Sequence, residues 1–190
     1  MDVYRLQPCE MARTIEWRHL WREGGGIERL TLDAQRAVGH IDCADGARPF
    51  ELDYEARWDL RWDTRFLSYR LQAGGSTLYK SLSGDGAGYW AVDGQPDKRL
   101  SGCLDADLWP TPFTNTLAIR RLLTASQTDA TIQVVWVDAF EGAVRAREQR
   151  YTLLTPARWR FESVEDGFVT ELTVDDDGIV IDYPGLFERS

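Results

Sequence analysis

Two aspartates separated by one residue, Asp105 and Asp107, are the side chains of this sequence that most directly suggest chemistry. In an extended segment, residues two apart project to the same side, so both carboxylates can accept sugar hydroxyls or pair with Arg120 and Arg121. We favour pairing with the arginines. Carboxylates at this spacing can also reach the separation of roughly 5–9.5 Å that glycoside hydrolysis uses, so a glycosidase is the enzymatic alternative.

Several features of the sequence oppose an enzyme. A catalytic acid needs a pKa raised by an apolar pocket, whereas a nearby guanidinium lowers the pKa. The sequence has no Gly-x-Ser-x-Gly elbow, no phosphate-binding glycine loop and no His-Glu-x-x-His motif. Its two histidines are His19 and His40, and its three cysteines, Cys9, Cys43 and Cys103, form no Cys-x-x-Cys pair. We therefore expect no catalytic residue, no metal and no cofactor, and we interpret the cysteines as buried thiols.

Tryptophan is abundant, with eight residues in a chain of 190. An indole ring combines an apolar body with one polar N–H group, which suits the rim of a site for a sugar-bearing lipid. Trp58 and Trp62 alternate with charged residues, so we assign them to the core. Trp90 and Trp109 lie beside glycines or prolines and are candidates for ligand contact.

Polar residues on the segment from Val144 to Leu154 complete the set of candidates. Gln149 and Tyr151 share one strand face and can satisfy buried polar groups. The candidate ligand-binding residues are Trp90, Asp105, Asp107, Trp109, Asn115, Arg120, Arg121, Gln149 and Tyr151.

The elements that carry these residues are mostly strands. From Phe50 to Asp63, apolar and charged residues alternate without a break, which predicts a strand with one covered face and one wet face. Its length suggests a curved sheet, bent at one point. Further strands, rich in β-branched or aromatic residues and separated by glycine turns, are predicted at 27–32, 65–71, 77–82, 89–93, 132–138, 144–154, 159–163, 168–174 and 179–183. We expect the strands of the C-terminal meander, 159–183, to pair in antiparallel fashion.

The segment from Gly102 to Leu123 breaks this pattern. Two prolines, Pro110 and Pro112, oppose regular strand pairing. Thr114 or Asn115 can then cap a short helix near residues 114–123. This segment is the functional loop that the sequence favours.

Length and charge restrict the remaining possibilities. A chain of 190 residues without a linker predicts one domain over residues 1–190. The formal net charge of −9 opposes binding to nucleic acid. The start of the sequence lacks a secretory signal and no apolar run reaches the ~20 residues of a membrane span, so we expect a cytoplasmic protein with no integral membrane association.

A series of short motifs follows the order found in a known family. They are Gly86–Trp90, Gly102–Leu108, Thr111–Leu117, Ile119–Leu122, Gln149–Tyr151 and Asp182–Phe187. With these motifs, nearly the whole chain resembles the bacterial putative glycolipid-binding family, although Ala118 stands where the family pattern has a proline. The resemblance implies a spiral β-roll, a partly open antiparallel barrel, with a cavity proposed to accept a glycolipid.

Three functions follow from these observations. The first is non-catalytic binding of a lipid, glycolipid or other amphipathic small molecule in an apolar cleft. The second is a carbohydrate- or lipid-active hydrolase that uses Asp105 and Asp107. The third is an interaction or scaffold protein whose roll is filled by its own side chains. We rank them in this order.

Overall fold

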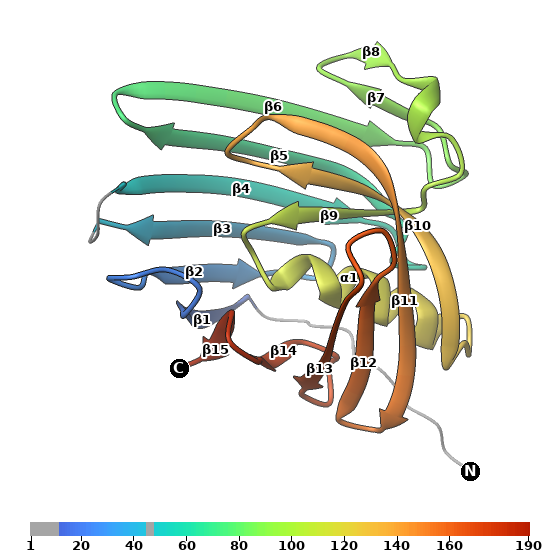
Figure 1. Ribbon diagram of the computed structural model, residues 1–190. Coiled ribbons are helices and arrows are strands. Elements are labelled where there is room, and N and C mark those ends of the chain that lie inside the picture. Colours follow the sequence, from blue (N-terminus) through green and yellow to red (C-terminus); the bar gives the residue numbers. More distant parts are fainter. Residues whose placement is uncertain (1–11, 45–47) are drawn as a thin grey trace.

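The computed structural model of the chain describes residues 12–44 and 48–190, and Figure 1 shows its architecture. Fifteen strands form one sheet, accompanied by one α-helix and a short 3-10 helix. The elements are β1 Arg13–His19, β2 Ile27–Leu32, β3 Arg36–Cys43, β4 Phe50–Trp58, β5 Thr64–Ala73, β6 Ser76–Gly84, β7 Trp90–Val92, β8 Gln95–Pro96, η1 Lys98–Leu100, β9 Asp105–Trp109, α1 Phe113–Thr124, β10 Asp129–Asp138, β11 Ala143–Thr155, β12 Arg158–Ser163, β13 Phe168–Val174, β14 Val180–Tyr183 and β15 Phe187–Arg189.

The order of the strands describes a spiral. β1 and β15 are neighbours in the middle of the sheet. From β1, the strands β2 to β8 follow in order to one edge, and from β15, the strands β14 to β9 follow to the other edge. The sheet curls into a roll that does not close into a barrel (Figure 1). The mostly β fold and the curved, partly open sheet predicted from the sequence are therefore confirmed.

The predicted C-terminal meander is antiparallel, whereas β9 pairs with β10 in parallel. Two parallel strands cannot be joined by a tight turn and need a crossover connection, which is usually a helix. Here α1 is that crossover, and it lies inside the curl of the sheet (Figure 1).

The helix predicted near residues 114–123 is confirmed as α1, but the predicted cap is not. Pro112 occupies the N-cap position and no side chain caps the helix from there. Instead, the Thr111 hydroxyl accepts from the Phe113 N–H, at 3.1 Å between Oγ1 and N. Thr114 is used elsewhere, since its hydroxyl accepts from the Leu108 N–H. Ten consecutive residues of the helix, 113–122, are buried, so α1 forms part of the core.

The long alternating strand is confirmed only as far as Trp58. β4 ends there because the Asp59 carboxylate accepts from the backbone N–H groups of Arg61 and Asp63 and folds the chain into a turn. Leu60, predicted on the covered face, is 86% exposed at the tip of this turn. Trp62 adopts a positive φ of 69° and stacks on Trp58 at 4.8 Å between ring centroids.

The buried thiols predicted from the sequence are present in the described residues. Cys43 and Cys103 are both buried and unpaired, and burial raises the pKa of each thiol to about 11. A raised pKa keeps a thiol protonated and unreactive at neutral pH. Cys9 lies outside the described residues.

Candidate functional site

A cleft with a volume of about 310 Å³ lies between β9, the start of α1 and the inner face of β11 to β15. Its volume is at the lower end of the range for small-molecule sites. The residues that line it are Asp107, Leu108, Trp109, Thr111, Asn115, Trp136, Arg147, Gln149, Phe161, Ser163, Asp166, Phe168, Tyr183, Leu186 and Phe187.

The wall of the cleft is a continuous run of aromatic rings that neighbouring strands contribute. Phe161 and Phe168 come from β12 and β13, and their ring centroids lie 6.4 Å apart. Tyr183 follows on β14, 6.3 Å from Phe168 and 5.7 Å from Phe187 of β15. Trp109 closes the run at 5.9 Å from Phe187. These spacings fall within the range of favourable aromatic pairs, so the wall is a packed surface.

The floor of the cleft is polar and centres on Asp107. The Thr114 hydroxyl donates to Asp107 Oδ1 at 2.7 Å, and the Gln149 amide donates to Asp107 Oδ2 at 2.6 Å. Thr114 also accepts from the Leu108 N–H, which leaves its own proton for the carboxylate. Both carboxylate oxygens therefore receive a hydrogen bond from the protein, and their remaining lone pairs are available to a donor in the cleft.

A second set of hydrogen bonds orients Gln149 from behind. Asn115 of α1 donates through Nδ2 to the Tyr151 hydroxyl at 2.9 Å, and Tyr151 in turn donates to Gln149 Oε1 at 3.1 Å. With its oxygen occupied by Tyr151, the Gln149 amide presents its N–H₂ group to Asp107. The hydrogen bonds thus run from Asn115 through Tyr151 and Gln149 to the Asp107 carboxylate. This direction suits an ionised Asp107, which can only accept.

Partial removal of the Asp107 carboxylate from water nevertheless disfavours its ionised form. Burial raises the pKa of Asp107, although the hydrogen bonds from Thr114 and Gln149 oppose the shift. Burial, and after it the negative charge of Asp107, also raises the pKa of Tyr151 and Tyr183, so both phenols stay protonated. Part of Asp107 still faces the cleft, because the residue lines it.

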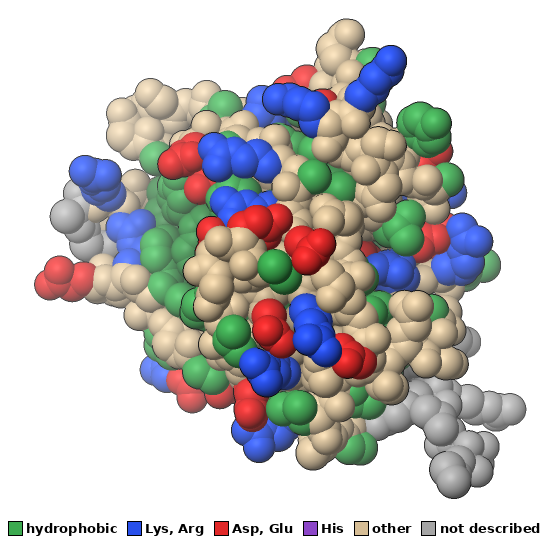
Figure 2. Space-filling view, turned by 45° about the vertical axis from the view of Figure 1, so that its right-hand side comes forward, with side chains coloured by type: hydrophobic (Ala, Val, Ile, Leu, Met, Phe, Trp, Pro, Cys, Tyr) green, Lys and Arg blue, Asp and Glu red, His purple; other side chains and the backbone are tan. Residues whose placement is uncertain are grey.

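The rim of the cleft carries an ion pair and an exposed aromatic side chain. Arg147 Nη1 lies 2.7 Å from Asp166, and its guanidinium rests on the Trp136 ring at 4.7 Å from the centroid. Phe168, the first residue of β13, lines the cleft and is exposed. Figure 2 shows charged side chains over much of one face and a recess on its left in which hydrophobic side chains gather.

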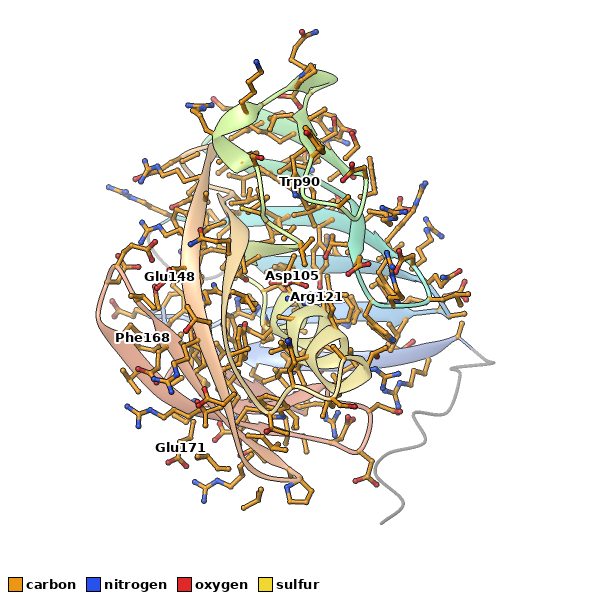
Figure 3. The ribbon with its side chains drawn as sticks, turned by 90° about the vertical axis from the view of Figure 1, so that its right-hand side faces the viewer. Trp90, Asp105, Arg121, Glu148, Phe168 and Glu171 are labelled. Atoms are coloured by element: carbon orange, nitrogen blue, oxygen red, sulfur yellow. The ribbon has the colours of Figure 1, made fainter. Side chains whose placement is uncertain are left out.

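Asp105 and Asp107 do share one side of β9, as the sequence predicted, but they have different partners. Arg121 donates from Nε and Nη2 to the Asp105 carboxylate, at distances of 2.6–3.0 Å, and both residues are buried. Figure 3 shows the two side chains together at the centre of the roll. Asp105 is absent from the cleft lining. The predicted pairing of an aspartate with an arginine of the helix therefore occurs at Asp105.

Burial and the contact between the two partners act in opposite directions on the pKa of each. Burial alone would lower the pKa of Arg121, but the hydrogen bonds and the charge of Asp105 outweigh burial, and the net direction is upward. Burial raises the pKa of Asp105, and the bidentate bonds from Arg121 oppose that shift. A bidentate arginine–carboxylate pair of this geometry is strong and directional. It fixes α1 on β9.

Two other candidates lie away from the cleft. The Arg120 guanidinium donates to the Asp177 carbonyl at 2.7 Å and stacks on Trp62 at 4.2 Å from the ring centroid. Trp90 is buried at the other end of the roll (Figure 3), where its indole N–H donates to the Cys103 carbonyl. The structure thus brings together Asp107, Trp109, Asn115, Gln149 and Tyr151 and leaves Trp90, Asp105, Arg120 and Arg121 elsewhere.

A buried polar network that the sequence interpretation missed adjoins the cleft at Thr111. Glu28 is fully buried, and its Oε1 accepts from the hydroxyls of Tyr54 and Thr111 at 2.5 and 2.6 Å. Its Oε2 lies 3.3 Å from Nε2 of His19, whose Nδ1 accepts from the Trp21 indole N–H. Burial, followed by the Glu28 charge, raises the pKa of Tyr54 well above its usual value.

One signal in the sequence could have found Glu28. β2 alternates, and Glu28 falls in the same phase as Leu30 and Leu32, which are buried. A charged residue at an inward position of an alternating strand needs a polar partner within the core. The network holds the chain after β9 against β2 and β4, and so positions the aromatic end of the cleft.

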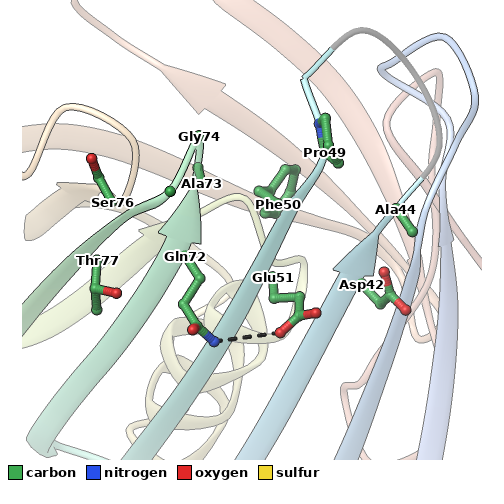
Figure 4. A pocket seen from close by; sticks show the side chains of 11 residues that line it. Asp42, Ala44, Pro49, Phe50, Glu51, Gln72, Ala73, Gly74, Ser76 and Thr77 are labelled. Carbon is green, nitrogen blue, oxygen red and sulfur yellow. Dashed lines mark hydrogen bonds between the residues drawn. The ribbon is translucent and has the colours of Figure 1, made fainter.

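Another depression, with a volume of about 380 Å³, lies over the ends of β3, β4 and β5 (Figure 4). Asp42, Glu51, Gln72 and Thr77 are among its lining residues, and Gln72 donates to Glu51 at 3.4 Å. Glu51 and Thr77 are exposed, so this depression belongs to the wet face of the sheet. It has neither the aromatic wall nor the buried polar floor of the cleft.

Comparison with known proteins gives two results. A family model described as putative glycolipid-binding matches residues 14–189. Among solved structures, a DUF1089 family protein from Pseudomonas aeruginosa is 37% identical, with a TM-score of 0.80, and the match covers 86% of this chain and 91% of that chain. No curated protein matches the sequence. In the described part of the chain, no helix is long and apolar enough to cross a membrane.

Proposed function

Since the chain belongs to the putative glycolipid-binding family, we propose that it binds the head group of a glycolipid or similar amphipathic molecule in the cleft, without catalysis. The observation that carries the proposal is the combination of an aromatic wall with a polar floor. Aromatic rings can pack against the C–H faces of a sugar, while Asp107 and Asn115 can bond its hydroxyls.

The size of the cleft decides which part of the ligand it holds. A volume of about 310 Å³ is at the lower limit for a small-molecule site and does not suit a sugar together with long acyl chains. The alkyl part would therefore lie at the mouth, against the exposed ring of Phe168. Asp105 cannot serve as the second carboxylate of a hydrolase that uses Asp105 and Asp107, because it is paired with Arg121.

Ligand binding can be tested directly on the purified protein. Native mass spectrometry should detect a co-purifying lipid, and titration with n-octyl β-D-glucoside should quench tryptophan fluorescence through Trp109. Ser163→Phe places a ring in the cleft and should weaken binding at least tenfold. Ser83→Phe, on an exposed position of β6, is the matched control and should bind like the parent. If no lipid is retained and no alkyl glucoside binds, the proposal is wrong.

A further inference from the structure

Within residues 12–44 and 48–190, the Asp107 carboxylate forms no ion pair with a basic side chain. Of the cleft-lining residues, Arg147 is the one cation, and it is paired with Asp166 at 2.7 Å. Among the described residues, no lysine, arginine or histidine nitrogen lies within 4.0 Å of the Asp107 carboxylate, whereas the neighbouring Asp105 has Arg121. Asp107 is thus a half-buried carboxylate held by the neutral donors Thr114 and Gln149.

When Asp107 is ionised, this arrangement places a negative charge at the floor of a cleft with an aromatic wall. Buried carboxylates are normally paired, because the loss of hydration is compensated only by an opposite charge or by several hydrogen bonds. Asp107 accepts two hydrogen bonds from the protein and lines the cleft, so a donor on a ligand can reach its remaining lone pairs. The missing partner is therefore a donor that enters the cleft with the ligand, and a positively charged donor compensates the charge best.

The walls favour the same ligand. Aromatic faces attract cations through their negative π surface, and cages of such rings recognise ammonium groups. Six aromatic residues line this cleft: Trp109, Trp136, Phe161, Phe168, Tyr183 and Phe187. One of them already carries a cation, since Arg147 rests on Trp136 at 4.7 Å from the ring centroid. The net charge of −9 on the whole chain also attracts cations toward the surface.

From these observations we infer that the cleft selects a head group with a positive charge, such as an amino sugar or another primary ammonium, over neutral and anionic head groups. The inference rests on the proposed function for the ligand's location, and it specifies the chemical class of the head group. The ammonium would donate to Asp107 and lie against the aromatic wall, while sugar hydroxyls reach Asn115.

Calorimetric titration with matched ligands tests the inference. The probes are n-octyl β-D-glucoside, its 2-amino-2-deoxy analogue, the N-acetyl derivative of that analogue, and glucosamine without an alkyl chain. At pH 7 the octyl amino sugar should bind at least tenfold more tightly than both neutral octyl glycosides. A tenfold preference corresponds to about 1.4 kcal/mol, which one charge-assisted hydrogen bond supplies.

Two variants assign the preference to Asp107. Asp107→Asn keeps the shape of the side chain, removes its charge and should reduce the preference to within twofold. Glu171→Gln makes the same change in net charge on an exposed position of β13 (Figure 3) and should leave the preference intact. Should Asp107→Asn fail to fold, the comparison of the amine with its N-acetyl derivative in the parent protein still decides.

Two of the outcomes separate the inference from the proposed function. Equal binding of the amine and the neutral glycosides overturns the charge preference and leaves glycolipid binding in place. Tighter binding of the octyl amine than of the neutral octyl glycosides, with equal binding of glucosamine that lacks the octyl chain, contradicts a lipid ligand and supports the charge preference. If none of the probes binds, both are overturned.

Discussion

At the scale of single residues, two aspartates on one strand have opposite roles. Asp105 is neutralised by Arg121, and Asp107 faces the cleft with neutral partners. The sequence predicts that both project to one side, because strand residues alternate. It cannot tell which arginine of the helix reaches which aspartate. Thr114 and Arg121 are seven residues apart, two helical turns, and so face the same strand, whereas Arg120 is rotated toward Asp177.

The Asp105–Arg121 pair gives a prediction about stability. Arg121→Met leaves a carboxylate buried without its partner, so the free energy of unfolding should fall by about 3–5 kcal/mol. The control is Arg150→Met, which breaks the exposed pair with Asp129 and should leave the free energy of unfolding almost unchanged, because solvent screens this pair. Urea denaturation of the purified variants measures both.

A double variant separates the charge from the packing. Replacing the pair with Arg121→Met and Asp105→Leu removes both charges, and most of the loss should be recovered, because a buried pair can be replaced by apolar side chains at little cost. If the double variant is as unstable as Arg121→Met alone, the arginine acts through contacts other than the ion pair.

At the scale of elements, the patterns predicted the type of most strands and the helix, and the exceptions have local causes. β4 ends at Trp58 although the alternation continues, because the Asp59 side chain forms a turn that period-two patterning does not encode. β3 was not predicted, because polar residues interrupt the apolar pattern of Arg36–Cys43. β9 was not predicted either, because its parallel pairing with β10 depends on α1, which folds back inside the roll.

A glycine in β3 gives a prediction at this scale. Gly39 is directly opposite Tyr54 in the β3–β4 pair, and a Cβ added to it would lie 2.1 Å from Tyr54 Cε1. The ring cannot retreat easily, because Glu28 and Thr111 hold its hydroxyl. Gly39→Ala should therefore lower the free energy of unfolding by about 1–3 kcal/mol. In a Tyr54→Leu background the same change should cost much less, and an unchanged cost would show that the clash is not with the ring.

At the scale of the whole molecule, the sequence predicts a curled β sheet but not its interior. Cleft residues such as Asp107 and Gln149 are 42 positions apart, and they meet only because the sheet curls around α1. Trp90 carries the same signal as Trp109, an indole beside turn residues, yet packs in the core. Residue type therefore predicts which kind of chemistry the site can perform. Which residues lie in the site depends on how the sheet curls, and the sequence pattern does not show this.

We expect the two edge strands of the sheet, β8 and β9, to differ in how readily they unfold locally. β8 is two residues long and exposed, so it is a free edge, whereas β9 lies inside the roll, where the Thr64 N–H donates to the Leu104 carbonyl at 3.3 Å. Amides in buried elements exchange with solvent only through large openings. In native-state hydrogen exchange, the backbone amides of β7 and β8 should exchange fastest. The opening free energy of the amides in β9 and α1 should be close to the free energy of global unfolding. Faster exchange in α1 than in β3 to β5 would instead show that the helix leaves the roll as a separate unit.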